Sequence, residues 1–394
     1  MTDGRWQMTG DTRQTADGGG SAPVSGVWHI LLVGVFLASI VALPVSQVAI
    51  ECARGEAVRE LRVFARFPTA ESLAEYERGL ERDSYVGAAV RRAVQRRLFG
   101  ALHAGNEKCV VGRDGALFYR PSIDSVVAPG FMAGPQAEGH PVRAITAFRD
   151  ALSTQGVELL LVAVPGKESV HPEWLAPGYP AEGPPPANVD LPAFMQALGE
   201  HGVRCIDPTG ALWAAKAHGP MYLRRDTHWS PAGLNVVADL VAQAVPPELR
   251  GESRFDVERL TIGHGGDLHD MLDIGRPPVV ETVRIDRVID ESTGEPVEPD
   301  ARSPVVLLGD SFTNIYSVPD LGWGDHAGLA EQLALRIGRR IDVIALNDGG
   351  VNTSRASLCR RPHPLEGKRL VIWQFAARDL VLANGNWKTM RIRR

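Results

Sequence analysis

Residues 304–312 read PVVLLGDSF, an apolar run that ends in Gly-Asp-Ser. The run from Val305 to Leu308 contains no polar residue, which is typical of a strand buried on both faces of a parallel sheet. In open sheets of this kind, ligands bind where the carboxyl ends of the strands meet loops and helix starts. Ser311 therefore lies where a nucleophile belongs, and its backbone N–H is suited to stabilise an oxyanion. The same three residues also fit a plain structural turn.

Short apolar runs of the same kind recur on both sides of this stretch and alternate with helical stretches. We expect five strands, at residues 157–164, 203–206, 305–308, 341–346 and 370–375. We expect helices at 141–153 and 325–339, and another where Ser230 caps a helix that begins at Pro231. This alternation predicts a three-layer α/β/α, flavodoxin-like domain with a parallel sheet. Residues 251–302 are rich in Gly, Pro and charge, fit the pattern poorly, and are interpreted as an insertion.

The N-terminal part of the chain has a different character. Residues 27–50 read VWHILLVGVFLASIVALPVSQVAI, without Asp, Glu, Lys or Arg, and are long enough to cross a bilayer as one retained helix. Residues 1–26 carry too few apolar groups to fold, so we expect a disordered tail. Apolar positions at helical spacing over 69–102 predict one or two amphipathic helices. We therefore expect a helical stalk at 51–105, followed by a domain at 106–390.

Composition excludes some classes of function. The formal net charge of −5 gives no basic field for phosphate backbones, so we expect no nucleic-acid partner. The four cysteines are scattered without C-x-x-C spacing, which argues against a structural zinc site or a dithiol redox motif. One or two disulfides remain open if the domain is exported.

A second candidate motif lies immediately before the helix that Ser230 caps. Residues 225–231 read RDTHWSP, and in an extended segment Asp226 and His228 would point the same way. A carboxylate so placed orients an imidazole, whose other nitrogen can take a proton from a serine. The alternative is that both residues cap the helix.

Other polar residues follow predicted strands and are candidates for oxyanion or substrate binding. Asn347, Gly349 and Gly350 follow the strand at 341–346 and offer a side-chain amide and unhindered backbone N–H groups, although a plain glycine turn fits too. Arg378 follows the strand at 370–375 and can bind a substrate carboxylate or cap a helix. Tyr316, five residues beyond Ser311, is a further candidate.

One loop has the composition of a metal site. Residues 263–270 read GHGGDLHD, with two His and two Asp in eight positions. No helical H-x-x-x-H pair or thiolate pair accompanies them, and a glycine-rich loop needs polar residues in any case. We therefore favour a structural loop and expect neither a metal nor a cofactor.

Taken together, GDSF at 309–312, DTHWSPAG at 226–233 and a membrane anchor resemble the SGNH-like acetyltransferases of the alginate O-acetyltransferase family. The similarity runs from about Ala101 to Trp387. It includes VVGRDGALFYRPSI at 110–123, VAVPGKESVHPEWL at 162–175, GDLHDML at 266–272, LLGDSFTNIYS at 307–317 and LVIWQFAARDL at 370–380. In that family the acid and base precede the serine, whereas ordinary SGNH hydrolases carry them near the C-terminus.

The resemblance implies a triad of Asp226, His228 and Ser311, with the oxyanion site near Asn347 and Gly349. It implies a single-pass inner-membrane protein whose periplasmic domain passes acetyl groups to polysaccharide hydroxyls. A separate multi-pass membrane acyltransferase would supply the acetyl groups. Two arginines precede the apolar helix and four follow it before residue 67, which by itself favours a cytoplasmic domain; on topology we follow the resemblance. A carbohydrate acetyl esterase with the same triad and a non-catalytic polysaccharide-binding scaffold are the alternatives.

Overall fold

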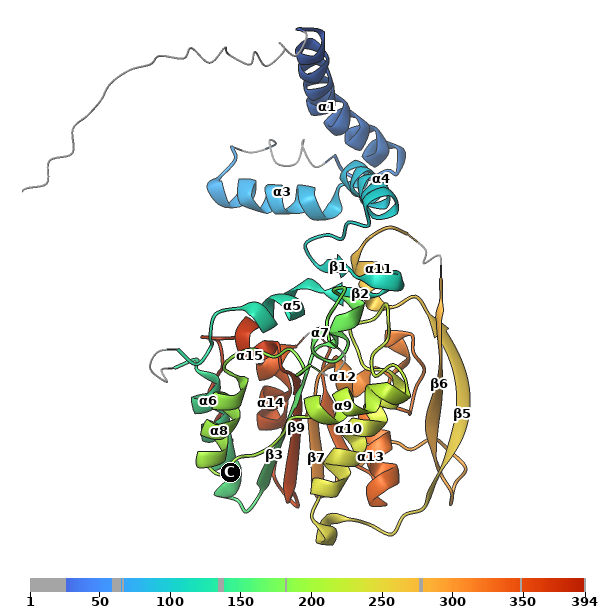
Figure 1. The fold of residues 1–394 in the computed structure, drawn as a ribbon. Coiled ribbons are helices and arrows are strands. Elements are labelled where there is room, and N and C mark those ends of the chain that lie inside the picture. The colour runs from blue at the N-terminus through green and yellow to red at the C-terminus, as the bar shows by residue number, and fades with distance from the viewer. Residues whose placement is uncertain are drawn as a thin grey trace, which may run out of the picture. The chain divides into compact units, whose positions relative to one another are not determined.

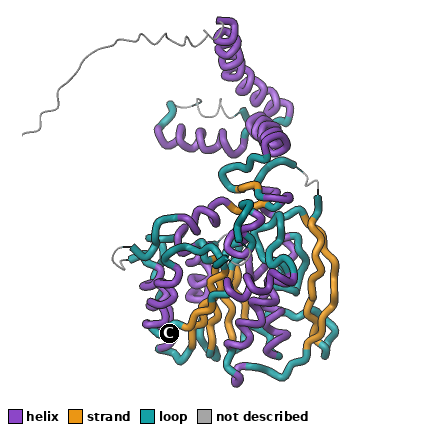
Figure 2. Tube along the Cα trace, in the orientation of Figure 1, coloured by secondary structure: helices purple, strands orange, loops and turns teal. Residues whose placement is uncertain are grey.

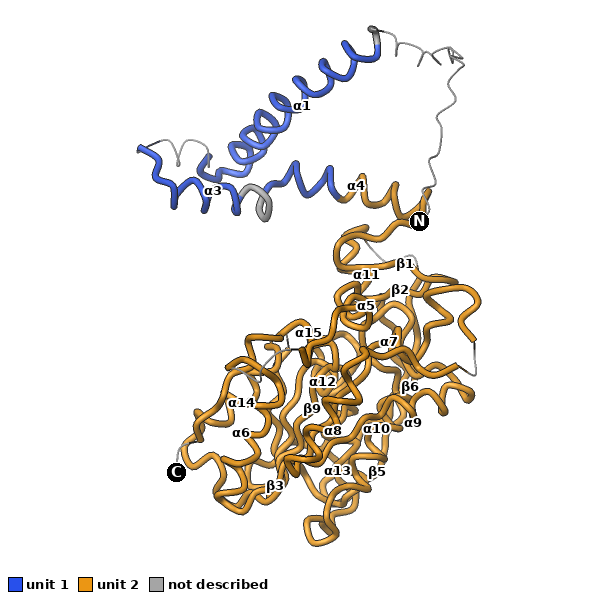
Figure 3. Tube along the Cα trace, turned by 60° about the vertical axis from the view of Figure 1, so that its left-hand side comes forward, with its two compact units in different colours: residues 1–91 blue, residues 92–394 orange. Residues whose placement is uncertain are grey.

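The computed structural model describes residues 26–58, 65, 67–133, 138–180, 183–275, 279–347 and 349–392. The chain divides into two compact units, residues 1–91 and 92–394 (Figure 3). The predicted disordered tail, residues 1–26, lies outside the described residues except for Gly26.

Most of the described residues of the first unit are helical. It contains the one helix of the described chain that is long and apolar enough to cross a membrane, α1 (Gly26–Ala53). The stretch predicted to be helical at 69–102 forms two helices, α3 (Ala70–Asp83) and α4 (Tyr85–Leu102). A capping box between Thr69 and Ser72 begins α3, because each side chain accepts a hydrogen bond from the other's backbone N–H.

The second unit is built on a five-stranded parallel sheet (Figure 1). In spatial order its strands are β4 (Arg204–Ile206), β3 (Glu158–Val164), β9 (Leu370–Ala376), β7 (Val305–Gly309) and β8 (Asp342–Ala345). All neighbouring pairs run parallel. These are the five strands that the apolar runs predict, so the predicted α/β class with a parallel sheet is confirmed.

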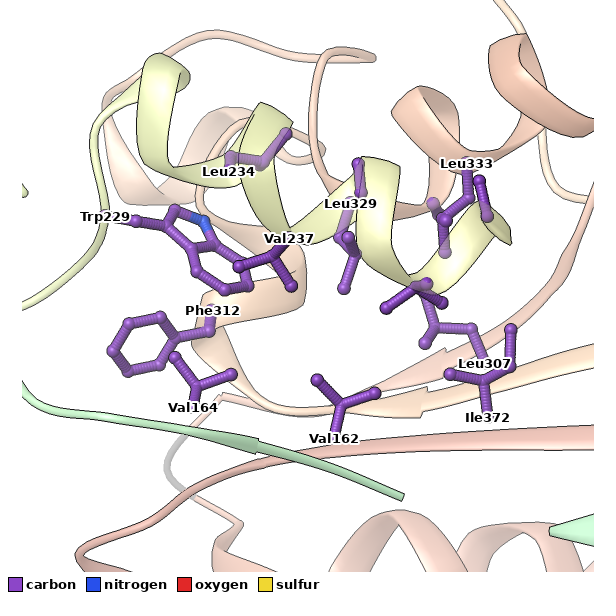
Figure 4. Close-up of a cluster of buried hydrophobic side chains, with 14 of the residues drawn as sticks. Val162, Val164, Trp229, Leu234, Val237, Leu307, Phe312, Leu329, Leu333 and Ile372 are labelled. Carbon is purple, nitrogen blue, oxygen red and sulfur yellow. The ribbon is translucent and has the colours of Figure 1, made fainter. Parts of the chain in front are cut away.

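Helices cover both faces of the sheet. On one face lie α10 (Pro231–Ala244) and α13 (Leu329–Ile337), and on the other α6 (Pro141–Ser153), α8 (Leu191–Glu200) and α14 (Gly350–Arg360). Alternate residues of β3 serve the two cores: Val162 and Val164 pack toward α10, while Leu161 and Ala163 pack toward α6. Figure 4 shows the first of these cores, in which Val162 and Val164 lie below α10.

The predicted helices are present, with one difference in length. The helix at 141–153 has its predicted bounds, and Ser230 caps α10 by accepting a hydrogen bond from the Gly233 N–H. Helix α13, however, spans Leu329–Ile337 rather than the predicted 325–339. The backbone N–H of Ala327 donates instead to the carbonyl of Tyr316, which ties this segment to the loop after β7.

Residues 251–302 form a structure separate from the sheet. Strands β5 (Phe255–His264) and β6 (Glu281–Asp290) pair antiparallel over ten residues, and Figure 2 shows them as a long ribbon at the side of the domain. The short helix α11 (Asp267–Met271) follows β5.

The remaining elements are short connections around the sheet. They are β1 (Cys109–Val111), β2 (Leu117–Tyr119), α5 (Arg120–Val127), α7 (Lys167–Val170), α9 (Thr209–Ala215), α12 (Ser311–Asn314), α15 (Asp379–Leu382) and 3-10 turns at Arg113–Gly115, Pro172–Trp174, Lys216–His218, Pro247–Leu249 and Pro319–Leu321.

Candidate active site

Three neighbouring strands carry polar residues just beyond their carboxyl ends. Ser311 follows β7, Asn347 follows β8 and Arg378 follows β9, and because these strands are parallel neighbours their ends meet at one edge of the sheet. All three residues line a cavity of about 240 Å³. Its other lining residues are Tyr119, Asp226, Thr227, His228, Asp267, Met271, Ile315 and Leu321.

Ser311 is fixed by its two chain neighbours. The Asp310 carboxylate accepts hydrogen bonds from the N–H of Phe312 (2.8 Å) and from the N–H of Ala376 on β9 (3.2 Å). The Phe312 ring is fully buried and meets the Trp229 ring edge-on at 5.1 Å between centroids (Figure 4). Packing of Phe312 into the core therefore turns Ser311 toward the cavity.

The Asp226–His228 pair lies at the tip of a narrow loop. Tyr222 and Trp229 form an antiparallel bridge that closes the loop at its base. The backbone bends over residues 224–228 instead of running extended, and Asp226 Oδ1 accepts the His228 N–H at 3.1 Å. This local turn, rather than an extended strand, brings the carboxylate beside the imidazole.

A continuous chain of hydrogen bonds joins Asp226, His228 and Ser311. The distance from Asp226 Oδ1 to His228 Nδ1 is 2.6 Å, and the distance from His228 Nε2 to Ser311 Oγ is 2.8 Å. The second carboxylate oxygen of Asp226 accepts from Trp323 Nε1 at 2.9 Å and from the Asp267 N–H at 3.0 Å. With a proton on Nδ1, His228 accepts from the serine hydroxyl, which is the geometry that base-assisted serine attack requires.

The pKa values of the pair move apart. Burial by itself raises the pKa of Asp226, but the charge of His228 and hydrogen bonds from His228 and Trp323 outweigh burial and hold this pKa well below its usual range. Burial lowers the pKa of His228, but the charge and hydrogen bond of Asp226 outweigh burial and raise this pKa above its usual value. Asp226 thus stays ionised and His228 is a stronger base than a free imidazole.

Asp267, from the loop interpreted as structural, lies at this site. Its Oδ1 accepts the Thr227 N–H at 2.7 Å, and its Oδ2 is 3.9 Å from His228 Nδ1. One ligand atom each from Asp226, His228 and Asp267 lie within 4.8 Å of one another, close enough for a cation. The hydrogen bonds already made by Asp226 and by His228 Nδ1 occupy these atoms, so the arrangement favours a proton relay over a metal ion.

Three of the candidate residues lie away from the cavity. Tyr316 is buried and its hydroxyl donates to the Trp229 carbonyl at 2.9 Å. Gly349 caps α14 and its carbonyl accepts from the Thr353 hydroxyl, while Gly350 begins α14 with a φ of 57°. None of these glycines or the tyrosine is among the residues that line the cavity.

Asn347 and Arg378 do face the cavity. Asn347 Oδ1 accepts from Asn314 Nδ2 at 3.0 Å, and within the described part of the chain the Asn347 amide N–H groups donate to no protein atom. The Arg378 guanidinium lies over the rings of Tyr119 (5.2 Å) and Phe312 (5.7 Å). Arg378 is the cap residue of α15 but makes no side-chain capping hydrogen bond. It lines this cavity and also a second pocket that contains Glu168, and its charge lowers the pKa of Glu168 against the effect of burial.

Several probable alginate O-acetylases resemble this chain in sequence. The chain is 29% identical over 229 residues to the probable alginate O-acetylase AlgJ of Pseudomonas syringae pv. tomato, which covers 55% of this chain and 56% of that protein. It is 33% identical over 155 residues to the AlgJ of Pseudomonas aeruginosa, covering 39% and 36% of the two chains. The matched segments thus span less than two thirds of these relatives.

Solved structures and a family model extend the comparison. The O-acetyltransferase domain of Pseudomonas putida AlgJ superposes with a TM-score of 0.53 at 24% identity, covering 70% of this chain and 92% of that one. Pseudomonas aeruginosa AlgX gives 0.50 at 24% identity, covering 68% and 61%. Both confirm the SGNH-like fold. The family model of the SGNH hydrolase-like domain, acetyltransferase AlgX, matches residues 109–377, and by this match the chain belongs to that family.

Proposed function

We propose that this protein is a serine O-acetyltransferase that moves acetyl groups onto hydroxyls of an exported polysaccharide through an acetyl-enzyme on Ser311. The observation that carries the proposal is the relay from Asp226 through His228 to Ser311, which opens on a cavity of about 240 Å³. The names of the relatives, probable alginate O-acetylases, support acetyl as the group and a polysaccharide as the acceptor.

The reaction has two half-reactions with the same relay. In the first, Ser311 Oγ attacks the carbonyl carbon of the acetyl donor while His228 Nε2 takes the hydroxyl proton. The tetrahedral intermediate then expels the donor's leaving group, which receives that proton. In the second, His228 takes the proton of a sugar hydroxyl as its oxygen attacks the acetyl carbonyl, and the proton returns to Ser311 as the ester forms. The Ser311 N–H and the Asn347 amide are the proposed oxyanion donors.

The membrane helix and the relatives support a location for this chemistry. With α1 as a single anchor, the second unit would lie on the periplasmic side of the inner membrane, where an exported polymer passes. A soluble acetyl donor such as acetyl-coenzyme A belongs to the cytoplasm, so the acetyl group would arrive through a multi-pass membrane acyltransferase.

The test is covalent labelling of the full chain in detergent. Incubation with an activated acetyl ester should add one acetyl group, and peptide mass spectrometry should find it on Ser311. The Ser311→Ala variant should gain none, whereas the control Ser357→Ala, on the helix α14, should label as the wild type does. Label on Ser311→Ala at the wild-type rate would show that the nucleophile is wrong.

A second measurement separates transfer from hydrolysis. The acetyl-enzyme is mixed with neutral and acidic oligosaccharides, and both acetylated sugar and free acetate are quantified. Sugar esters as the main product support the transferase, and acetate alone, with every acceptor, makes the protein an esterase.

A further inference from the structure

We infer that Asp267 is a positioning residue of the proposed triad: it holds the loop that carries Asp226 and His228, and it places a second negative charge beside the Nδ1 edge of the imidazole. This inference rests on the proposed function of the same site. It gives the inserted segment, residues 251–302, a part in the chemistry.

Two hydrogen bonds tie Asp267 to the loop from both directions. Its carboxylate accepts the Thr227 N–H at 2.7 Å, and its own N–H donates to Asp226 Oδ2 at 3.0 Å. Thr227 lies between the proposed acid and the proposed base, so the first bond fixes the turn that brings Asp226 and His228 together. The second bond fixes the carboxylate that orients the imidazole. Through these two hydrogen bonds Asp267 holds the loop that carries the proposed acid and base, which a solvent-exposed residue would not do.

The chain is adapted to this close approach. Gly266, the residue before Asp267, has a φ of 87°, and a Cβ at Gly266 would lie 2.2 Å from the carbonyl oxygen of Arg225. A side chain at position 266 is therefore excluded by both conformation and space. The inserted segment can pack its backbone directly against the Arg225–Asp226 turn only with glycine here.

The ionisation of Asp267 affects the protonation of His228. Burial, and next the charge of Asp226, raise the pKa of Asp267 to about 6. Because 31% of its side chain remains exposed, water moderates this shift. Above that pH the ionised Asp267 favours the protonated form of His228, whose Nδ1 is 3.9 Å away. Below that pH Asp267 is neutral, and of these two carboxylates only Asp226 then stabilises the protonated form of His228.

Other titratable groups face the same cluster. Lys167 is buried, and burial lowers the pKa of its ammonium to about 8 while Asp226 and Asp267 oppose that change. Its Nζ donates to the carbonyls of Leu117 and Arg224, so it is held near the acids without bonding to them. Further groups that bear on His228, Asp267 or Lys167 are Arg378, Cys109 and Glu281.

The test uses the full chain and an isosteric change. Asp267→Asn keeps an oxygen for the Thr227 N–H but removes the charge. We expect the acidic limb of kcat/KM, measured with an activated acetyl ester, to move to lower pH by about 0.5–1 unit, because His228 loses a neighbouring negative charge. Asp267→Ala should show the same shift and a further loss of more than about tenfold at the plateau, since Thr227 loses its acceptor. The control is Asp270→Asn, on α11 with its side chain 71% exposed. It should change neither the pH of the acidic limb nor the plateau value of kcat/KM.

A measurement independent of activity separates this inference from the proposed function. The His228 titration is followed by NMR of isotope-labelled histidine in the Ser311→Ala background, with His228→Gln for assignment. Asp267→Asn should lower the His228 pKa here too, even if no acetyl transfer is ever observed. An Asp267→Asn variant that loses rate while the limb and the His228 titration stay in place would reduce Asp267 to a structural residue and overturn the inference.

Discussion

Trp323 Nε1 donates a hydrogen bond of 2.9 Å to Asp226 Oδ2, although the two residues lie 97 positions apart in the chain. The Trp323 ring is fully buried and binds one carboxylate oxygen, Oδ2, while the imidazole of His228 binds the other, Oδ1. A carboxylate with fixed partners on both oxygens cannot rotate away from His228. Orientation of the base is thus shared between a loop near residue 226 and a loop after the serine.

We predict that Trp323→Phe lowers turnover by about tenfold to a hundredfold without unfolding the protein. The phenyl ring fills most of the space but donates no hydrogen bond, and a hydrogen bond to a charged group contributes about 1.5–3 kcal/mol. The measurement is kcat with an activated acetyl ester, alongside thermal denaturation. Trp387→Phe is the matched control, because the Trp387 indole is equally buried but its N–H has no hydrogen-bond partner among the residues that the structure describes. Equal losses in both variants would argue against the role of the Trp323 bond.

Asp226→Asn should be far more damaging. Loss of the charge that orients and stabilises the imidazolium costs about 10⁴ in turnover in serine-triad enzymes. Here the introduced amide must also turn its N–H₂ group toward either His228 or the two N–H donors that Oδ2 of Asp226 accepts from. Single-turnover acetylation of Ser311 is the measurement, with Asp270→Asn as control. A loss below about tenfold would make Asp226 a structural residue of the loop.

Activity and stability should respond to pH in opposite directions around His228. Catalysis needs the neutral imidazole, so kcat/KM should rise with pH through the raised pKa of His228. The folded pKa lies above the ordinary value of about 6.5, so the ion pair with Asp226 stabilises the fold fully below that value and loses this contribution as pH rises through the folded pKa. Kinetics and thermal denaturation of the full chain over about pH 5–9 check both. In His228→Gln this loss of stability with rising pH should disappear. If the loss remains, it belongs to another titrating group.

Much of the fold follows from local sequence because buried parallel strands are apolar on both faces. The runs at β3, β7 and β9 therefore stand out without any knowledge of their neighbours. The β1–β2 hairpin has only three residues in each strand, too short for any periodicity to show, and the sequence does not predict it.

The site residues also fall into those that the local sequence predicts and those that it does not. Asp226, His228 and Ser311 carry local signals, since each lies at a strand end or before a helix. Trp323 carries no such signal, and its importance arises from a tertiary contact with the loop at 226. Asp267 lies in a glycine-rich stretch that the sequence marks only as a metal site or a structural loop, and its tertiary contacts with Thr227 and Asp226 give it a place in the site. Tyr316 shows the reverse case. It is close to Ser311 in sequence, but the turn after α12 directs it into the core, where its hydroxyl binds the Trp229 carbonyl.

Topology is the point on which charge and resemblance disagree. We expect a C-terminal alkaline phosphatase fusion to be active and a fluorescent protein that matures only in the cytoplasm to stay dark, because the proposed acceptor is exported. The same pair of reporters placed before α1 should give the opposite result. An active cytoplasmic reporter at the C-terminus would restore the topology that the arginines after α1 favour.

Arg378 should decide which acceptors the cavity takes. Its guanidinium lines the cavity with Ser311, is held over two aromatic rings, and makes no side-chain cap on α15. A carboxylate-bearing sugar would therefore gain a charge-assisted hydrogen bond that a neutral sugar would not. We predict that Arg378→Gln raises KM for acidic oligosaccharides at least about tenfold, while acetylation of Ser311 by a small neutral ester changes less than about threefold. Arg302→Gln, at a side chain 93% exposed, is the control. If KM for neutral and acidic acceptors rises equally, Arg378 shapes the cavity but does not read charge.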